Sequence, residues 1–145
     1  MRGRRGFTLI EVLVAMMILG ILINIAIPAV QDAKRKALAA SAIADVQVIQ
    51  TAVIDYFAEN DVVPASAGWG AIPAGLRASL PNNFVFMEGD VSYRWQRFGA
   101  RRQRRTGQLG RIRVRSSDRK LATDIRRLYQ GRATGRGGTL TLIVE

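Results

Sequence analysis

The feature that most constrains the fold is an apolar run from Phe7 to Ala29 that contains a single carboxylate, Glu11. As a helix, these 23 residues would extend about 34 Å, enough to cross a hydrocarbon core of about 30 Å. A charge within such a segment is costly in lipid and is functional by default, so Glu11 needs a partner. Cleavage after Gly6 would create one, because the new amine on Phe7 carries a positive charge four residues away.

The residues on either side of the apolar run set its orientation and shape. Arg2, Arg4 and Arg5 precede it, and this basic cluster favours a cytoplasmic N-terminus with the rest of the chain outside the cytoplasm. Pro28 removes a backbone donor and crowds the carbonyl of Asn24, which predicts a kink or a local loosening of the helix there.

Two other interpretations of the N-terminus remain open. It could be a secretory signal peptide that is removed near the small residues 26–29. It could also be an uncut membrane anchor, in which Glu11 lies in the first turn of the helix, where the helix dipole favours an anion.

The composition limits the chemistry that the chain can perform. Residues 1–93 carry 7 basic and 8 acidic side chains, whereas residues 94–145 carry 15 basic and 3 acidic ones, which gives the total of +11. The chain has no Cys and no His, so disulfides, thiol nucleophiles, Ser-His-Asp triads and the usual zinc sites are excluded. We therefore expect no catalytic residue, no metal and no cofactor, and hence no enzyme.

The remaining pattern predicts an α+β fold. Residues 30–60 should form an amphipathic helix, residues 61–83 are rich in Pro and Gly and should form a connecting loop, and residues 84–145 should form a small head. The predicted apolar stripe of the helix consists of Ile43, Val46, Ile49, Val53, Tyr56 and Phe57. Trp69 is expected to pack the loop onto the core.

Alternating apolar and polar residues predict four antiparallel strands and one further helix in the head. Strands are expected at 84–88 and 91–98, around a Gly89-Asp90 turn, and at 111–115 and 139–144. Residues 99–107 are expected to form an exposed loop. Ser117 should cap a helix that starts at Asp118.

The sequence Gly6-Phe7-Thr8-Leu9-Ile10-Glu11, with its basic leader and apolar helix, resembles the class III signal of type IV prepilins and pseudopilins. The resemblance implies that residues 1–6 are a leader peptide and residues 7–29 a transmembrane and filament-core helix. It also implies that prepilin peptidase cuts between Gly6 and Phe7 and methylates the Phe7 amine. Glu11 would pair with that amine on a neighbouring subunit, with Thr8 and Pro28 as further assembly residues.

The same resemblance implies partners and a location. The partners are prepilin peptidase, other pilin or pseudopilin subunits, the inner membrane and the assembly platform. The chain would be a single-pass protein of the inner membrane with a cytoplasmic N-terminus and an external head, and would enter a periplasmic or extracellular filament. It would act as a structural subunit of a type II secretion or type IV pilus-like system.

An arginine-rich face supports an alternative function. Alternation places Arg94, Arg111, Arg113 and Arg115 on the outer face of the predicted sheet, and Arg101, Arg102, Arg104 and Arg105 lie in the following segment. Such a surface would attract the phosphates of nucleic acid, as in a minor pilin that binds DNA for uptake. Tyr93 and Trp95 fall on the core face, so the strands themselves offer no aromatic ring for stacking on bases. A solvated face and an unprocessed envelope protein are the remaining alternatives.

Overall fold

A computed structural model describes residues 7–129, 134–135 and 138–145 of the chain, which divides into two compact units, Met1–Arg35 and Lys36–Glu145. We call the whole second unit the head, so the head includes the C-terminal part of α1 and the connecting segment as well as residues 84–145. One helix, α1 (Leu9–Asn60), contributes residues to both units, as the sequence predicts. Residues 24–28 remain helical although Pro28 lies inside α1.

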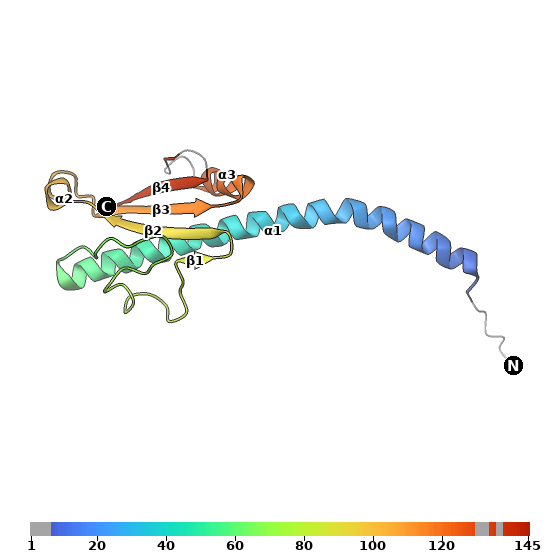
Figure 1. Cartoon of the computed structure of the whole chain (residues 1–145), viewed down its shortest axis with the longest axis horizontal. Helices are drawn as coiled ribbons and strands as arrows, with labels where there is room; N and C mark the ends of the chain where they lie inside the picture. The colour runs from blue at the N-terminus through green and yellow to red at the C-terminus, as the bar shows by residue number, and fades with distance from the viewer. Residues whose placement is uncertain (1–6, 130–133, 136–137) are drawn as a thin grey trace. The chain divides into compact units, whose positions relative to one another are not determined.

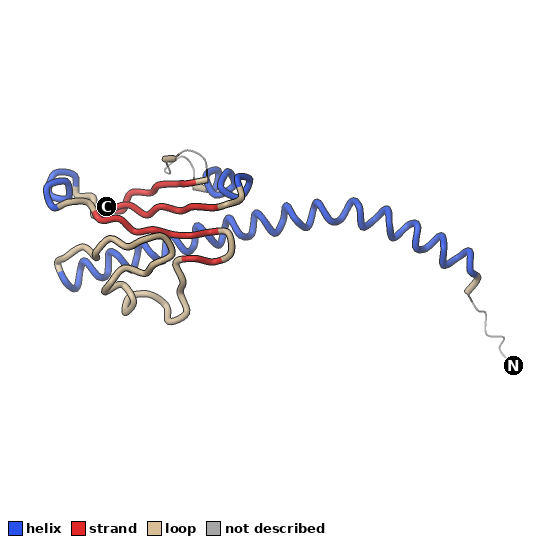
Figure 2. The backbone as a smooth tube through the Cα atoms, viewed as in Figure 1, coloured by secondary structure: helices blue, strands red, loops and turns tan. Residues whose placement is uncertain are grey.

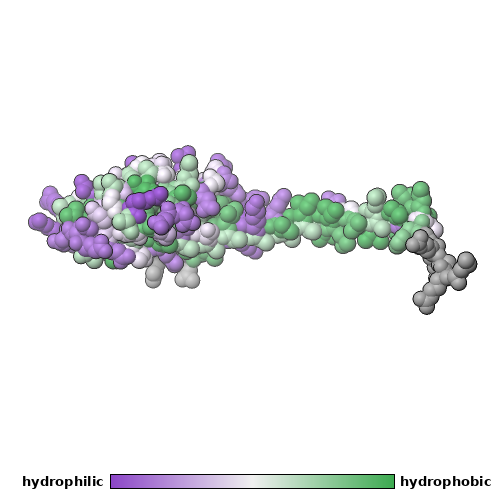
Figure 3. Space-filling view, turned by 90° about the horizontal axis from the view of Figure 1, so that it is seen from below, coloured by the Kyte–Doolittle hydropathy of each residue, from purple (hydrophilic) through white to green (hydrophobic). Residues whose placement is uncertain are grey.

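The N-terminal unit exposes its apolar side chains. Every residue from Phe7 to Val30 is exposed, and Figure 3 shows a hydrophobic surface along this part of α1. By length and composition, this is the helix of the described chain that could cross a membrane. A helix that is apolar on all sides requires lipid or other helices around it.

The head contains a four-stranded antiparallel sheet with the order β1-β2-β3-β4 (Figure 1). Its strands are β1 (Met87–Glu88), β2 (Val91–Arg97), β3 (Gly110–Ser116) and β4 (Thr139–Val144). The predicted Gly89-Asp90 hairpin, the third strand and the last strand are confirmed, although β1 is shorter than expected. Each strand thus lies next to its neighbours in sequence, an order that the sequence alone does not specify.

The core lies between one face of the sheet and the C-terminal part of α1. Val46, Ile49 and Val53 of the predicted stripe are buried there, against Trp95 of β2 and Ile112 of β3 among others. The other predicted members, Ile43, Tyr56 and Phe57, are partly buried. The predicted stripe omitted three buried alanines of α1: Ala39, Ala42 and Ala52.

Two helices accompany the strands, where the sequence predicted one. Residues 99–107 are not simply a loop, because α2 (Ala100–Thr106) connects β2 to β3. The side-chain amide of Gln103 donates to the carbonyl of Phe98 at 2.5 Å, and Gly107 ends the helix with a left-handed φ of 71°. The segment therefore forms a capped helix without a buried face.

The helix α3 (Arg119–Leu128) buries Leu121, Ala122 and Ile125 in the head. Ser117 is not its cap, contrary to the prediction. Asp118 precedes the helix and accepts a hydrogen bond from the Lys120 amide at 2.8 Å, whereas the Ser117 hydroxyl donates to Asp90.

The segment between α1 and β1 follows the edge of the sheet without forming a regular element (Figure 2). Its amides at Ala67 and Gly70 donate to the carbonyls of Trp95 and Tyr93. Leu76 and Leu80 reach the core. Trp69 does not, and the prediction that it packs the loop onto the core is wrong.

Gly110 allows the largest core side chain to fit. A Cβ at this position would lie 2.4 Å from Cη2 of Trp95 and 2.6 Å from the carbonyl oxygen of Gln96. Trp95 is fully buried, and its indole nitrogen donates to the Pro64 carbonyl at 3.1 Å. The glycine is therefore required for close packing of the indole against β3.

Candidate functional site

The first turn of α1 holds the single carboxylate of the apolar segment. The Thr8 amide and the Thr8 hydroxyl each donate to Oε2 of Glu11 at 2.8 Å. In return, the Glu11 amide donates to the Thr8 hydroxyl at 3.3 Å. Since α1 begins at Leu9, Thr8 is the N-cap residue and Glu11 is the third helical residue, which is the arrangement of a capping box.

This geometry gives Glu11 a role within a single chain. The carboxylate satisfies an amide that has no intrahelical partner, and it lies at the positive end of the helix dipole. The position of Glu11 in the first turn was expected from the sequence, whereas its reciprocal bonds with Thr8 were not predicted. The spacing Thr-x-x-Glu ahead of an apolar run was the signal that could have found them.

The residue before the cap is accessible. Phe7 is 89 % exposed in the single chain. Gly6 and the arginines of the predicted leader lie outside the described residues. Pro28 is also on the exposed surface of the N-terminal unit, twenty residues beyond Thr8. The residues predicted for processing and assembly that are described therefore all lie on an exposed surface.

The predicted arginine face is divided between the sheet and the helix α2. Arg94 of β2 and Arg111, Arg113 and Arg115 of β3 share the outer face of the sheet, and we call these the sheet-face arginines. Arg101, Arg102, Arg104 and Arg105 lie on α2, and we call these the α2 arginines. The α2 arginines are all exposed. Arg102 also stacks on the Phe98 ring, with its guanidinium carbon 3.9 Å from the ring centroid.

An aromatic residue that the sequence analysis assigned to the core lies among the sheet-face arginines. The guanidinium carbons of Arg113 and Arg115 are 5.6 Å and 5.8 Å from the centroid of the Trp69 ring. Trp69 is partly buried and belongs to the segment that follows the edge of the sheet. No sequence pattern links Trp69 to β3, which is forty residues away.

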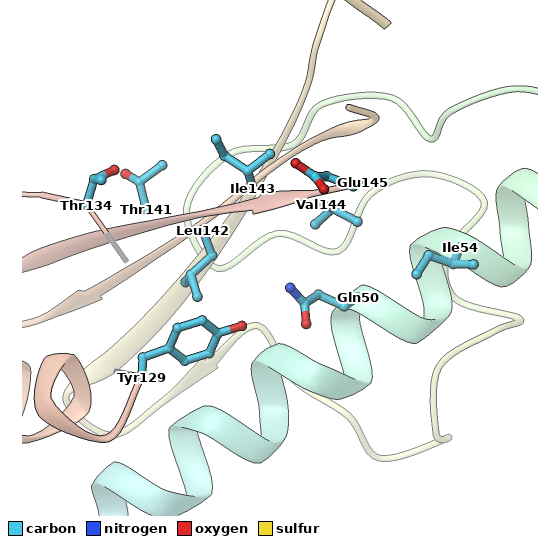
Figure 4. Close-up of a pocket in the computed structure, with 9 residues that line it drawn as sticks. All are labelled: Gln50, Ile54, Tyr129, Thr134, Thr141, Leu142, Ile143, Val144 and Glu145. Atoms are coloured by element: carbon cyan, nitrogen blue, oxygen red, sulfur yellow. The ribbon is translucent and has the colours of Figure 1, made fainter. Parts of the chain in front are cut away.

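A groove of about 630 Å³ lies between α1 and β4 in the head. Gln50 and Ile54 of α1 face Leu142 and Val144 of β4 across it, and Tyr129 lies at one side (Figure 4). Among the described residues that line the groove, Glu145 is the only carboxylate. The described lining therefore contains no pair of carboxylates.

The N-terminal part of the chain, which contains the first turn of α1, is similar to known proteins. Residues 1–26 match the prokaryotic N-terminal methylation motif. The chain is 38 % identical over 66 residues to the type II secretion system core protein G of Vibrio cholerae, covering 46 % of this chain and 45 % of that protein. It is 34 % identical over 92 residues to a type IV major pilin protein of Neisseria gonorrhoeae, covering 61 % and 56 %.

A fimbrial protein of Pseudomonas aeruginosa is 36 % identical over 67 residues, which cover 46 % of this chain and 44 % of that protein. The chain thus spans about half the length of these relatives. No solved structure matches the chain. The methylation motif, the shared N-terminal half and the α+β architecture with its long N-terminal helix all make this chain similar to type IV pilins and to type II secretion system core protein G.

Proposed function

We propose that this chain is a structural subunit of a pilin-like filament that is anchored in the inner membrane before assembly. The observation that carries the proposal is the Thr8–Glu11 capping box at the start of a fully exposed apolar helix. Exposed apolar surface on all sides of a helix is stable in lipid or in a bundle of similar helices, and both environments are available to a filament subunit. The relatives named above are a type II secretion system core protein G, a fimbrial protein and a type IV major pilin protein, which supports a role in such an assembly.

In this proposal, prepilin peptidase cuts between Gly6 and Phe7 and methylates the new amine of Phe7. The head lies outside the cytoplasm, since the leader arginines retain the N-terminus on the cytoplasmic side. In the membrane, Thr8 shelters the Glu11 carboxylate. During assembly, Glu11 turns to the Phe7 amine of a neighbouring subunit, and this charge pair sets the stagger between helices.

Replacement of Glu11 tests the assembly role. Glu11→Ala should be processed normally but should not enter filaments, because the Phe7 amine of its neighbour then has no counter-charge. Intact-mass measurement reports processing, and the amount of subunit in sheared filaments reports assembly. Glu59→Ala removes an exposed acid from the head end of α1 and should assemble normally.

The role of Glu11 fails if Glu11→Ala subunits enter filaments at the normal level. The processing step is tested separately with Gly6→Ala, which should leave the leader attached. A mature N-terminus at Phe7 in that variant would contradict the proposed cleavage site. Thr8→Ser keeps both hydrogen bonds to Glu11 and should behave normally, whereas Thr8→Val should assemble less efficiently.

A further inference from the structure

The outer face of the sheet concentrates positive charge in a regular array. Arg111, Arg113 and Arg115 alternate along β3, which spaces them by about 6.6–6.8 Å. Arg94 of β2 is directly opposite Arg113 in the strand register. Like charges at directly opposed positions destabilise a sheet. An anion bound to this face would offset that repulsion.

The head supplies little to neutralise these side chains. Among the described residues, no acidic side chain forms a salt bridge with any of the four sheet-face arginines. Arg111 donates from Nε to the Gln96 side chain at 3.0 Å. The Nε of Arg94 is buried and has no hydrogen-bond partner within the described part of the head. These two Nε atoms do not reach a ligand, but the terminal nitrogens of the four guanidiniums form no hydrogen bond with the described residues and remain for one.

Trp69 orders two of the four arginines. Its ring is within 6 Å of both the Arg113 and the Arg115 guanidinium carbons, at 5.6 Å and 5.8 Å. Such contacts hold a guanidinium electrostatically against the ring, and they reduce the side-chain entropy that is lost when the guanidinium binds a ligand. Trp69 is therefore a positioning residue for this surface.

The charge of the chain indicates whether the outer face of the sheet binds a second copy of the chain or a different partner. Residues 94–145 carry 15 basic and 3 acidic side chains, so two heads meeting on this face repel each other. Of those acids, Asp118 caps α3 and Glu145 accepts a hydrogen bond from Gln108. A nucleic acid instead presents a dense and regular line of phosphates, about one charge per 1.7 Å of duplex. Guanidiniums bind phosphates with two parallel hydrogen bonds.

We propose that the sheet-face arginines, ordered by Trp69, bind the phosphate backbone of nucleic acid. The α2 arginines extend the basic surface at the end of the sheet where β2 ends and β3 begins (Figure 1). Because its contacts are to phosphates, the surface binds without base specificity. This binding is independent of filament assembly, since a purified single chain carries the whole site.

Fluorescence anisotropy of the full chain in zwitterionic micelles, with a labelled oligothymidylate and a matched duplex, tests the proposal. The triple variant Arg94→Gln, Arg113→Gln, Arg115→Gln should bind the single strand at least about tenfold more weakly at low salt. Its plot of log affinity against log salt should be flatter by about two, since each lost phosphate contact removes about 0.7. A chain that binds neither probe at low salt overturns the proposal.

The matched control removes the same charge from another surface. Arg119→Gln, Lys120→Gln and Arg127→Gln lie on the exposed side of α3, whose buried side joins the core on the opposite face of the sheet. This variant should keep most of the affinity. Equal losses in the two triple variants would show general charge attraction and would refute a site. Equally tight binding of polyglutamate would assign the face to an acidic protein and would also refute it.

Two further variants test the geometry while the charge stays constant. Arg113→Lys with Arg115→Lys keeps the charge but loses the planar donors, so affinity should fall severalfold while the salt dependence is retained. Trp69→Phe should bind better than Trp69→Ala, because a phenyl ring still holds the guanidiniums. Nucleic acid should also change the tryptophan fluorescence of the natural chain but not that of Trp69→Phe, whose remaining Trp95 is buried. An undiminished change in Trp69→Phe would place the ligand elsewhere.

Discussion

The two parts of α1 use the same secondary structure in opposite ways. From Leu9 to Val30, α1 is apolar except for Glu11 and Asn24, and every residue of this stretch is exposed. In the head, one stripe of α1 is buried, and three of its six buried residues are alanines. The first part requires a partner along its length, whereas the second already has one in the sheet. The hydrophobic surface is thus left uncovered in one part and stabilises the fold in the other.

Replacing one isoleucine by alanine in each part of α1 should have the largest effect of the tests that distinguish the two parts. Ile49→Ala removes a fully buried side chain from the head and should lower its free energy of unfolding by about 2–5 kcal/mol. Ile18→Ala removes the same atoms from the N-terminal unit, where Ile18 is 52 % exposed, and should change head stability by less than about 0.5 kcal/mol. Near-ultraviolet circular dichroism of denaturant titrations in micelles measures both.

Equal destabilisation of the head by the two variants would contradict this distinction, because the exposed part of α1 would then unfold cooperatively with the head.

In filaments, we expect the N-terminal substitution to have the larger effect. Ile18→Ala should reduce incorporation of the subunit more than an Ile54→Ala control does, since Ile54 lies on the exposed side of α1 in the head.

A polar contact inside the head gives a second, smaller test. The Tyr93 hydroxyl donates to Oδ2 of Asp45 at 2.7 Å, which joins β2 to α1. Tyr93→Phe should lower the free energy of unfolding by about 1.5 kcal/mol, because it removes a hydrogen bond to a charged group. Tyr129→Phe removes another tyrosine hydroxyl from the head and should cost less, since no hydrogen bond to that hydroxyl is present in the described structure.

This contact also predicts a pH dependence. Burial, and then the Asp45 carboxylate, raise the pKa of Tyr93 well above its ordinary value. The unfolded chain releases this proton near pH 10, whereas the folded chain retains it. The contribution is therefore complete below about pH 10 and declines as the pH rises from there toward the folded pKa. The stability difference between the natural chain and Tyr93→Phe should narrow above about pH 10, and a constant difference would contradict this assignment.

The elements that could be predicted from sequence are those with a clear apolar period. In the head, the long helix has apolar residues at spacings of three and four, because it buries one face. The strands β2, β3 and β4 have them at every second residue for the same reason. The N-terminal part of the helix is recognised because it is apolar throughout. The importance of Glu11 could also be predicted, since a single carboxylate in an apolar run has a high free-energy cost in lipid. Strand order depends on how loops fold over long distances, and no local pattern encodes it.

The errors have local physical causes. α2 has no buried residue, so its sequence shows no apolar periodicity. Gly107, which ends the helix, is equally typical of a turn in a loop. Trp69 has an apolar ring that either a core or a pair of guanidiniums can cover, and only the path of the loop decides between them. Ser117 and Asp118 are both good caps, and the choice depends on Asp90, which engages the Ser117 hydroxyl from the β1–β2 turn.

The choice of cap gives the smallest predicted effect. Asp118→Ala leaves the Lys120 amide without its acceptor and should destabilise the head by about 1 kcal/mol, the usual cost of losing an N-cap. Asp118→Asn retains an oxygen acceptor and should recover most of that loss, which separates capping from the change in charge. Ser117→Ala loses an exposed bond to Asp90 that water can replace, so its effect should be smaller than that of Asp118→Ala. If Ser117→Ala proved the more harmful substitution in denaturant titrations, the β1–β2 turn would stabilise the head more than the cap of α3 does. The stability of the sheet would then depend on its hairpin rather than on the helix beside it.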